Sequence, residues 1–109
     1  MATTYKVLGQ IVPSATTLTT LYTVPSSTST VCSTLVICNE GVTTETFRLA
    51  IRPAGAAIDP KHYISFDASV SQNNSVFLTL GITLATTDVV SVYTSGAAIA
   101  FSLLGSEIV

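Results

Sequence analysis

Charged residues are what this sequence lacks most. Only 9% of its 109 residues are charged, with four Lys or Arg against six Asp or Glu and a net charge of −2. An average soluble domain has roughly 25%. The basic residues are too few and too scattered for a nucleic-acid-binding stripe, so we expect no nucleic acid partner. Because solubility normally depends on surface charge, we expect a homo-oligomer or another assembly that covers part of the surface.

Membrane and helical patterns are also missing. No apolar run approaches the roughly 20 residues of a membrane span, and no segment of helical length has a 3.6-residue period. We therefore expect no membrane association. The segment Met1–Lys6 has neither the basic nor the apolar region of a signal peptide, which predicts synthesis in a cytoplasm without export by the usual route.

The residues that catalysis and metal binding require are scarce. His62 is the only histidine, and the sequence has no Gly-x-Ser-x-Gly elbow and no Gly-rich phosphate loop. The six acidic residues are dispersed, mostly at expected turns, and form neither a glycosidase pair nor a calcium loop. The sequence therefore predicts no catalytic residue, no cofactor and no metal, and a protein that is not an enzyme.

Cysteine occurs twice, at Cys32 and Cys38. If 31–38 is one strand, both side chains lie on the same face with Cα atoms roughly 20 Å apart, at about 3.3 Å per residue. A disulfide needs a Cα separation below about 7 Å. We therefore expect two free thiols that act as small buried packing residues.

What the sequence has in quantity is apolar residues, which make up 48% and alternate with Thr and Ser. β-branched Thr favours strands over helices. About seven or eight short strands at regular spacing predict a single all-β domain, a Greek-key or jelly-roll-like antiparallel β-sandwich over 15–109. Residues 1–14 are expected to form an N-terminal arm that reaches a neighbouring subunit, or a simple edge strand.

The clearest strand is 47–52. Phe47, Leu49 and Ile51 alternate with Arg48, Ala50 and Arg52, so we expect the first three in the core and the second three on the outside. Pro53 should end the strand.

The remaining strands are predicted from turn residues and alternation. We expect a hairpin between 30–38 and 47–52, and a second hairpin between 63–70 and 76–84. In 63–70, Ile64, Phe66, Ala68 and Val70 are predicted to face inward. The last strand is expected over 97–104, followed by a tail over 105–109.

Two groups of residues are candidates for a protein interface. The first lies in the N-terminal segment, and the second is an outward basic and aromatic patch, because Arg and Tyr are favoured at interfaces. The candidates are Tyr5, Lys6, Val7, Leu8, Arg48, Arg52, Lys61, His62 and Tyr63. The alternative for the arginines is local pairing with Glu45 or Asp67 on a solvated face.

Five segments together resemble a family of small virion structural proteins of tailed bacteriophages, many of which infect cyanobacteria and other aquatic bacteria. These segments are Tyr22–Ser26, Leu35–Asn39, Phe47–Gly55, Lys61–Ile64 and Leu78–Leu84. The resemblance implies a β-sandwich in the virion, made in the cytoplasm of a host bacterium. It carries over no individual functional residue.

The resemblance implies one of two roles. The first is a capsid decoration (cement) protein that binds and stabilises the lattice of the major capsid protein, with a trimer matching the three-fold positions of the lattice. The second is a tail, baseplate or fibre-adaptor component that binds other tail proteins. A carbohydrate-binding module is a weaker alternative, because the chain has no Trp for sugar stacking.

Overall fold

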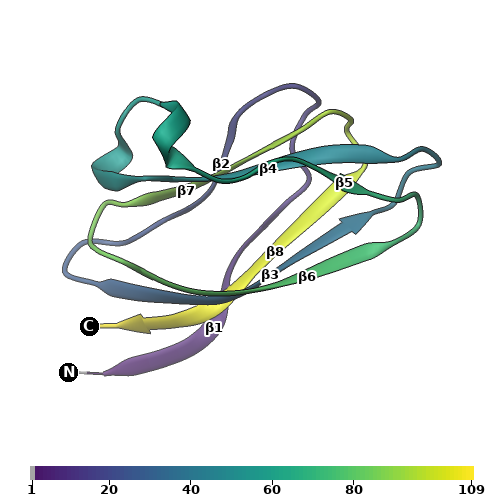
Figure 1. The fold of residues 1–109 in the computed structure, drawn as a ribbon. Helices are drawn as coiled ribbons and strands as arrows, with labels where there is room; N and C mark the ends of the chain where they lie inside the picture. The colour runs from purple at the N-terminus through teal and green to yellow at the C-terminus, as the bar shows by residue number, and fades with distance from the viewer. Residues whose placement is uncertain (1) are drawn as a thin grey trace.

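The structure is a computed structural model that describes residues 2–109, which form two antiparallel four-stranded sheets packed face to face (Figure 1). The strands are β1 (Thr3–Ile11), β2 (Thr19–Thr23), β3 (Ser29–Asn39), β4 (Glu45–Arg52), β5 (Tyr63–Val70), β6 (Ser75–Leu84), β7 (Val89–Thr94) and β8 (Ile99–Ile108). Two 3₁₀ turns, η1 (Pro53–Gly55) and η2 (Pro60–His62), lie between β4 and β5. The prediction of an all-β sandwich of seven to eight antiparallel strands is confirmed.

The strand order is that of a jelly roll. Sheet A has the order β1-β8-β3-β6 and sheet B the order β2-β7-β4-β5. The first strand therefore pairs with the last, the second with the seventh, the third with the sixth and the fourth with the fifth. This pairing is that of one long antiparallel hairpin rolled up into two sheets.

The two predicted hairpins are wrong. β3 and β4 lie in different sheets, and so do β5 and β6, because both connecting loops cross from one sheet to the other. Buried Asn39 anchors the two crossings: its Nδ2 donates to the carbonyls of Thr43 at 2.9 Å and Val70 at 3.0 Å, and its Oδ1 accepts from the Gly41 N–H at 2.9 Å. Turn residues and alternation show where a strand ends but not which sheet the next strand joins.

The core lies between the sheets. Phe47 of β4 and Phe101 of β8 meet edge to face across it, with ring centroids 6.1 Å apart. Leu49 is also fully buried, as predicted, and Ile51 is half-buried. Ala50, expected outside, is fully buried, because its short side chain lies between two neighbouring strands, opposite Tyr63 of β5 and Ser91 of β7.

A bulge in β3 corrects the prediction for the cysteines. The register with β8 shifts between Cys32 and Thr34, so that Ser33 is the extra residue in that ladder. In the ladder with β6, Ser33 lies opposite two residues, Leu80 and Gly81. Cys32 therefore faces the core, whereas Cys38 is only half-buried and points out of the other face. Both thiols are free, as expected, and burial raises the pKa of Cys32 to about 11, which keeps it un-ionised.

A second bulge corrects the prediction for β5. Asp67 has φ +53°, and the pairing with β4 shifts between Phe47 and Leu49. Side chains before the bulge therefore change face: Ile64 is 56% exposed and Phe66 57% exposed, although both were predicted to be in the core. Val70, beyond the bulge, is buried as expected.

The chain ends are paired with each other. β8 continues to Ile108, so the predicted tail is instead strand, held between β1 and β3. β1 is the edge strand of sheet A and pairs with β8 from Thr3 to Ile11. Of the segment 1–14 that was expected to be an arm or an edge strand, Met1 lies outside the described residues.

Candidate interaction surfaces

Sheet A carries no unpaired charge. Within its four strands, all of which the structure describes, the only charged residues are Lys6 and Glu107, and they pair with each other with Nζ and Oε1 3.2 Å apart. All other charged residues lie in sheet B or in loops. The outer face of sheet A is built from Thr, Ser and apolar side chains such as Val31, Val36 and Phe77.

A shallow groove of about 610 Å³ lies on this sheet where β1, β8 and β3 run side by side. Its lining includes Tyr5 and Val7 of β1, Val31 of β3 and Leu104 of β8. Gly105 lies in the groove and allows β8 to approach β3 closely, because a Cβ there would collide with the carbonyl oxygen of Val31.

The four interface candidates of β1 divide between its two faces. Tyr5 is 83% exposed and Val7 49% exposed, and both border the groove. Leu8 packs against the core, and Lys6 reaches Glu107. Tyr5 and Val7 are therefore the two that remain free to contact a partner.

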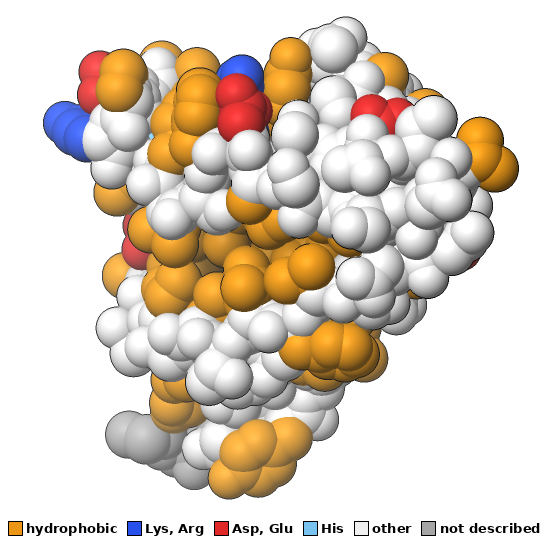
Figure 2. Space-filling model, turned by 45° about the vertical axis from the view of Figure 1, so that its right-hand side comes forward, with side chains coloured by type: hydrophobic (Ala, Val, Ile, Leu, Met, Phe, Trp, Pro, Cys, Tyr) orange, Lys and Arg blue, Asp and Glu red, His pale blue; other side chains and the backbone are white. Residues whose placement is uncertain are grey.

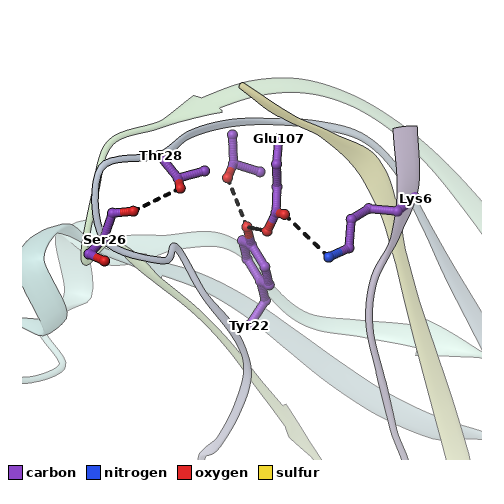
Figure 3. A network of polar contacts seen from close by, with 6 residues as sticks. Lys6, Tyr22, Ser26, Thr28 and Glu107 are labelled. Atoms are coloured by element: carbon purple, nitrogen blue, oxygen red, sulfur yellow. Dashed lines mark hydrogen bonds and ion pairs between the residues drawn. The ribbon is translucent and has the colours of Figure 1, made fainter. Parts of the chain in front are cut away.

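Glu107 joins β8 to β1 in its own sheet and to β2 in the opposite sheet through a small polar network (Figure 3). The hydroxyl of Tyr22, from β2 of the opposite sheet, donates to Glu107 Oε2 at 2.5 Å and lies 2.8 Å from Thr30 Oγ1. Burial, together with the hydrogen bond to Glu107, raises the pKa of Tyr22 to about 12, so it remains a donor at ordinary pH. The hydrogen bond from Tyr22 lowers the pKa of Glu107 despite partial burial, and Lys6 adds to this effect.

The lowered pKa of Glu107 makes stability depend on pH. A carboxylate with a depressed folded-state pKa stabilises the fold above its unfolded-state pKa of about 4.3, and this contribution is lost as the pH falls through the folded-state value. Glu107→Gln should lower the free energy of unfolding by about 1–2 kcal/mol at pH 7, and the difference from wild type should shrink below about pH 4. Urea titrations at pH 7 and pH 3 measure both quantities.

The matched control is Glu40→Gln, on an exposed loop residue. It should change the free energy of unfolding by less than about 0.5 kcal/mol. A pH-independent loss at Glu107 would show that the carboxylate charge has no part in the effect.

Arg48 is the centre of the second candidate surface, on the outer face of sheet B. Its guanidinium lies 4.1 Å from the ring centroid of Phe66, 4.3 Å from that of Tyr93 and 6.0 Å from that of Tyr63. Its Nε donates to Asp67 Oδ1 at 2.7 Å, and this hydrogen bond raises the pKa of Arg48 further. Of the two acids considered for local pairing, Asp67 is the partner.

The other basic candidates do not join Arg48 in one patch. Arg52 donates to Ser91 Oγ and to the carbonyl of Ala56, both at 3.2 Å, and so ties η1 to the sheet. His62 is buried, and its Nδ1 accepts from the Asp59 N–H at 3.1 Å in a capping box at η2. Lys61 is exposed on the same turn. Arg48 and Tyr63 are thus the pair that the structure brings together.

The fold of this chain is similar to that of solved structures. The chain is similar to a chain in the structure of infectious bursal disease virus, Gx strain, with 14% sequence identity and a TM-score of 0.53. The shared feature is the fold. The match covers 97% of this chain but 32% of the viral chain, so this chain spans about a third of its length. No protein-family model and no curated protein sequence matches the chain. The tailed-phage origin therefore remains a prediction.

Two further findings apply to residues 2–109. Within them, no group of three or more His, Cys, Asp or Glu side chains is placed to hold a metal ion. In the same range, no helix has the length and apolar character to cross a membrane.

Sequence reasoning missed Phe66 and Phe77 as surface residues. Phe77 is 70% exposed and stands at an outward position of the β6 alternation, between the inward Val76 and Leu78. An aromatic residue out of phase with its apolar neighbours was the signal that could have identified it. Phe66 gave no such signal, because the bulge at Asp67 places it outside.

Proposed function

We propose that this chain is a non-enzymatic structural protein of a virion, and that it decorates the capsid by binding and stabilising the lattice of the major capsid protein. The observation that carries the proposal is that the four strands of sheet A carry no unpaired charge. The jelly-roll fold, which also occurs in a virus structure over nearly the whole chain, supports it. A cement protein must bury surface against its neighbours, and it needs neither a cleft nor a cofactor.

The distribution of charge favours sheet A as the docking face. Taking a charge out of water is costly unless it is paired, and the charges of sheet A, on Lys6 and Glu107, already pair with each other. Sheet B carries Arg48, Arg52, Asp67 and Glu45, which suit a face that stays in water. The chain therefore lies on the shell through sheet A, with sheet B outward.

A tail, baseplate or fibre-adaptor role is the alternative that the sequence resemblance leaves open, and the number of copies per particle separates it from decoration.

A carbohydrate-binding module is disfavoured, because the Arg48 guanidinium stacks on Phe66 and Tyr93. One face of each ring is thereby occupied, which leaves less aromatic surface for a sugar.

Val36→Lys tests the docking face. Val36 is half-buried on the outward side of β3, at the middle of sheet A, where a lysine can extend its charge into water in the free protein. Docking would bury that charge without a partner, so we expect affinity for particles assembled from the major capsid protein to fall at least about tenfold. Cosedimentation with such particles measures the affinity.

The matched control is Ser69→Lys, an exposed outward position of β5 in sheet B. It should bind particles as the wild type does. Loss of binding at Ser69→Lys with normal binding at Val36→Lys would reverse the orientation and refute docking through sheet A.

A further inference from the structure

The sandwich is closed on one side and open on the other. On the closed side β1 meets β2, and a Cβ at Gly9 would collide with the carbonyl oxygen of Leu21. On the open side, no ladder among residues 2–109 joins β5 to β6. The inward side chains of β6 that pack against the core are only half-buried: Val76, Leu78, Leu80 and Ile82. Figure 2 shows apolar side chains gathered in a recessed band across the molecule, bordered mainly by uncharged polar side chains.

β6 is also an unprotected sheet edge. Among the described residues only β3 pairs with it, so its backbone groups on the other side are free for a further strand. Natural edge strands are usually short, bulged or marked by charge or proline. β6 has ten residues with no charge and no proline. Its ladder with β3 shifts only at Leu80 and Gly81, so Ser75–Thr79 keeps an unbroken register and is the stretch open to pairing.

The other three edges are protected. β1 carries Lys6, and β2 has five residues and lies against β1. β5 is interrupted by the bulge at Asp67, which also carries a charge. β6 is therefore the edge best suited to accept another strand.

We propose that a second copy of this chain pairs with β6, antiparallel, about a two-fold axis at Phe77. In this register Phe77 lies opposite its own copy, Val76 opposite Leu78, and Ser75 opposite Thr79. The occupant is a second copy because this segment is complementary to itself: both strands are uncharged, so pairing neither buries nor opposes any charge.

Pairing covers the surfaces that the single chain leaves open. The two Phe77 rings, each 70% exposed in one chain, meet on the axis. The half-buried Val76 and Leu78 of each copy meet those of the other at the open sides of the two cores. The contact produces a dimer, whereas the expected trimer rests on capsid symmetry alone. The inference concerns the isolated chain and does not depend on the proposed function.

Cysteine cross-linking tests the register. Residues opposite each other in antiparallel strands have Cα atoms about 4.5–5.5 Å apart, within the range of a disulfide. Phe77→Cys should therefore give a disulfide-linked dimer under mild oxidation. The control Thr79→Cys places the two thiols about 13 Å apart along the strands, which is too far. Wild type, with Cys32 and Cys38, should also remain uncrosslinked. Equal cross-linking in both variants, or none in Phe77→Cys, would overturn the proposal.

The mass in solution gives an independent test. Light scattering over a concentration series should show wild type approaching twice its chain mass of 11.3 kDa. Phe77→Glu sets two like charges opposite each other and should raise the dissociation constant at least about tenfold. Tyr5→Glu, at the opposite edge of the same sheet and 83% exposed, should leave the dimer intact. A monomer at all concentrations, a trimer, or a dimer lost in Tyr5→Glu alone would overturn the proposal.

Discussion

Phe101→Ala is expected to lower the free energy of unfolding by about 3–5 kcal/mol. Phe101 is 1% exposed and is the β8 partner in the edge-to-face contact with Phe47 of β4, so it links the two sheets. Truncation removes buried apolar surface and leaves a cavity between sheets that cannot close up fully. The whole free energy of unfolding of a small domain is about 5–15 kcal/mol, so this substitution should remove a large part of it. Urea unfolding followed by circular dichroism measures the loss.

The control for Phe101 is the same substitution at Phe77. Phe77 is 70% exposed, so Phe77→Ala should cost less than about 1 kcal/mol when measured on dilute, monomeric protein. Equal losses at the two positions would contradict the placement of Phe101 in the core and of Phe77 on the surface.

Gly105→Ala is expected to cost about 3 kcal/mol or more, although it adds a single methyl group. A Cβ at this position would collide with the Val31 carbonyl oxygen, and it would lie 3.1 Å from the Cys32 Cα. Both obstacles belong to the backbone of β3, the central neighbour of β8, so neither can move without disturbing the ladder. The free energy of unfolding in urea measures the effect.

Gly81→Ala separates collision from backbone strain. Gly81 has φ +63°, and a Cβ there would meet no atom within 4 Å. Its replacement should cost about 1–2 kcal/mol, from the left-handed conformation alone. If Gly105→Ala lowers the free energy of unfolding no more than Gly81→Ala does, β8 can move away from β3. The close approach of these two strands would then not be required for stability.

Alternation predicted the parts of the fold where the strands are regular. Phe47 and Leu49 are buried as expected, and β6 keeps its inward and outward positions over its whole length. The errors begin at bulges. Ser33 and Asp67 each add one residue to a ladder, and every side chain beyond the bulge changes face. Ser and Asp are common in regular strands and turns alike, so neither residue marks a bulge in the sequence.

The candidate surfaces were predictable only in part. The pairing of Arg48 with Tyr63 follows from the outward position of Arg48 in β4 and from the place of Tyr63 at the start of the next strand, β5. The burial of His62 had a signal in the sequence, since Asp59 followed by Pro60 is typical of a capped turn start and His62 completes the capping box. That sheet A carries no unpaired charge could not be recognised, because this depends on which four strands share a sheet. That grouping depends on the two loops that cross between sheets near Asn39.

The central claim is the proposed decoration of a capsid, and the most direct test is to count this chain in purified virus particles by quantitative mass spectrometry against the major capsid protein. The proposed decoration of the capsid predicts hundreds of copies per particle. A small multiple of three or six would contradict decoration and place the chain in the tail. Absence from the particles would contradict any structural role in the virion.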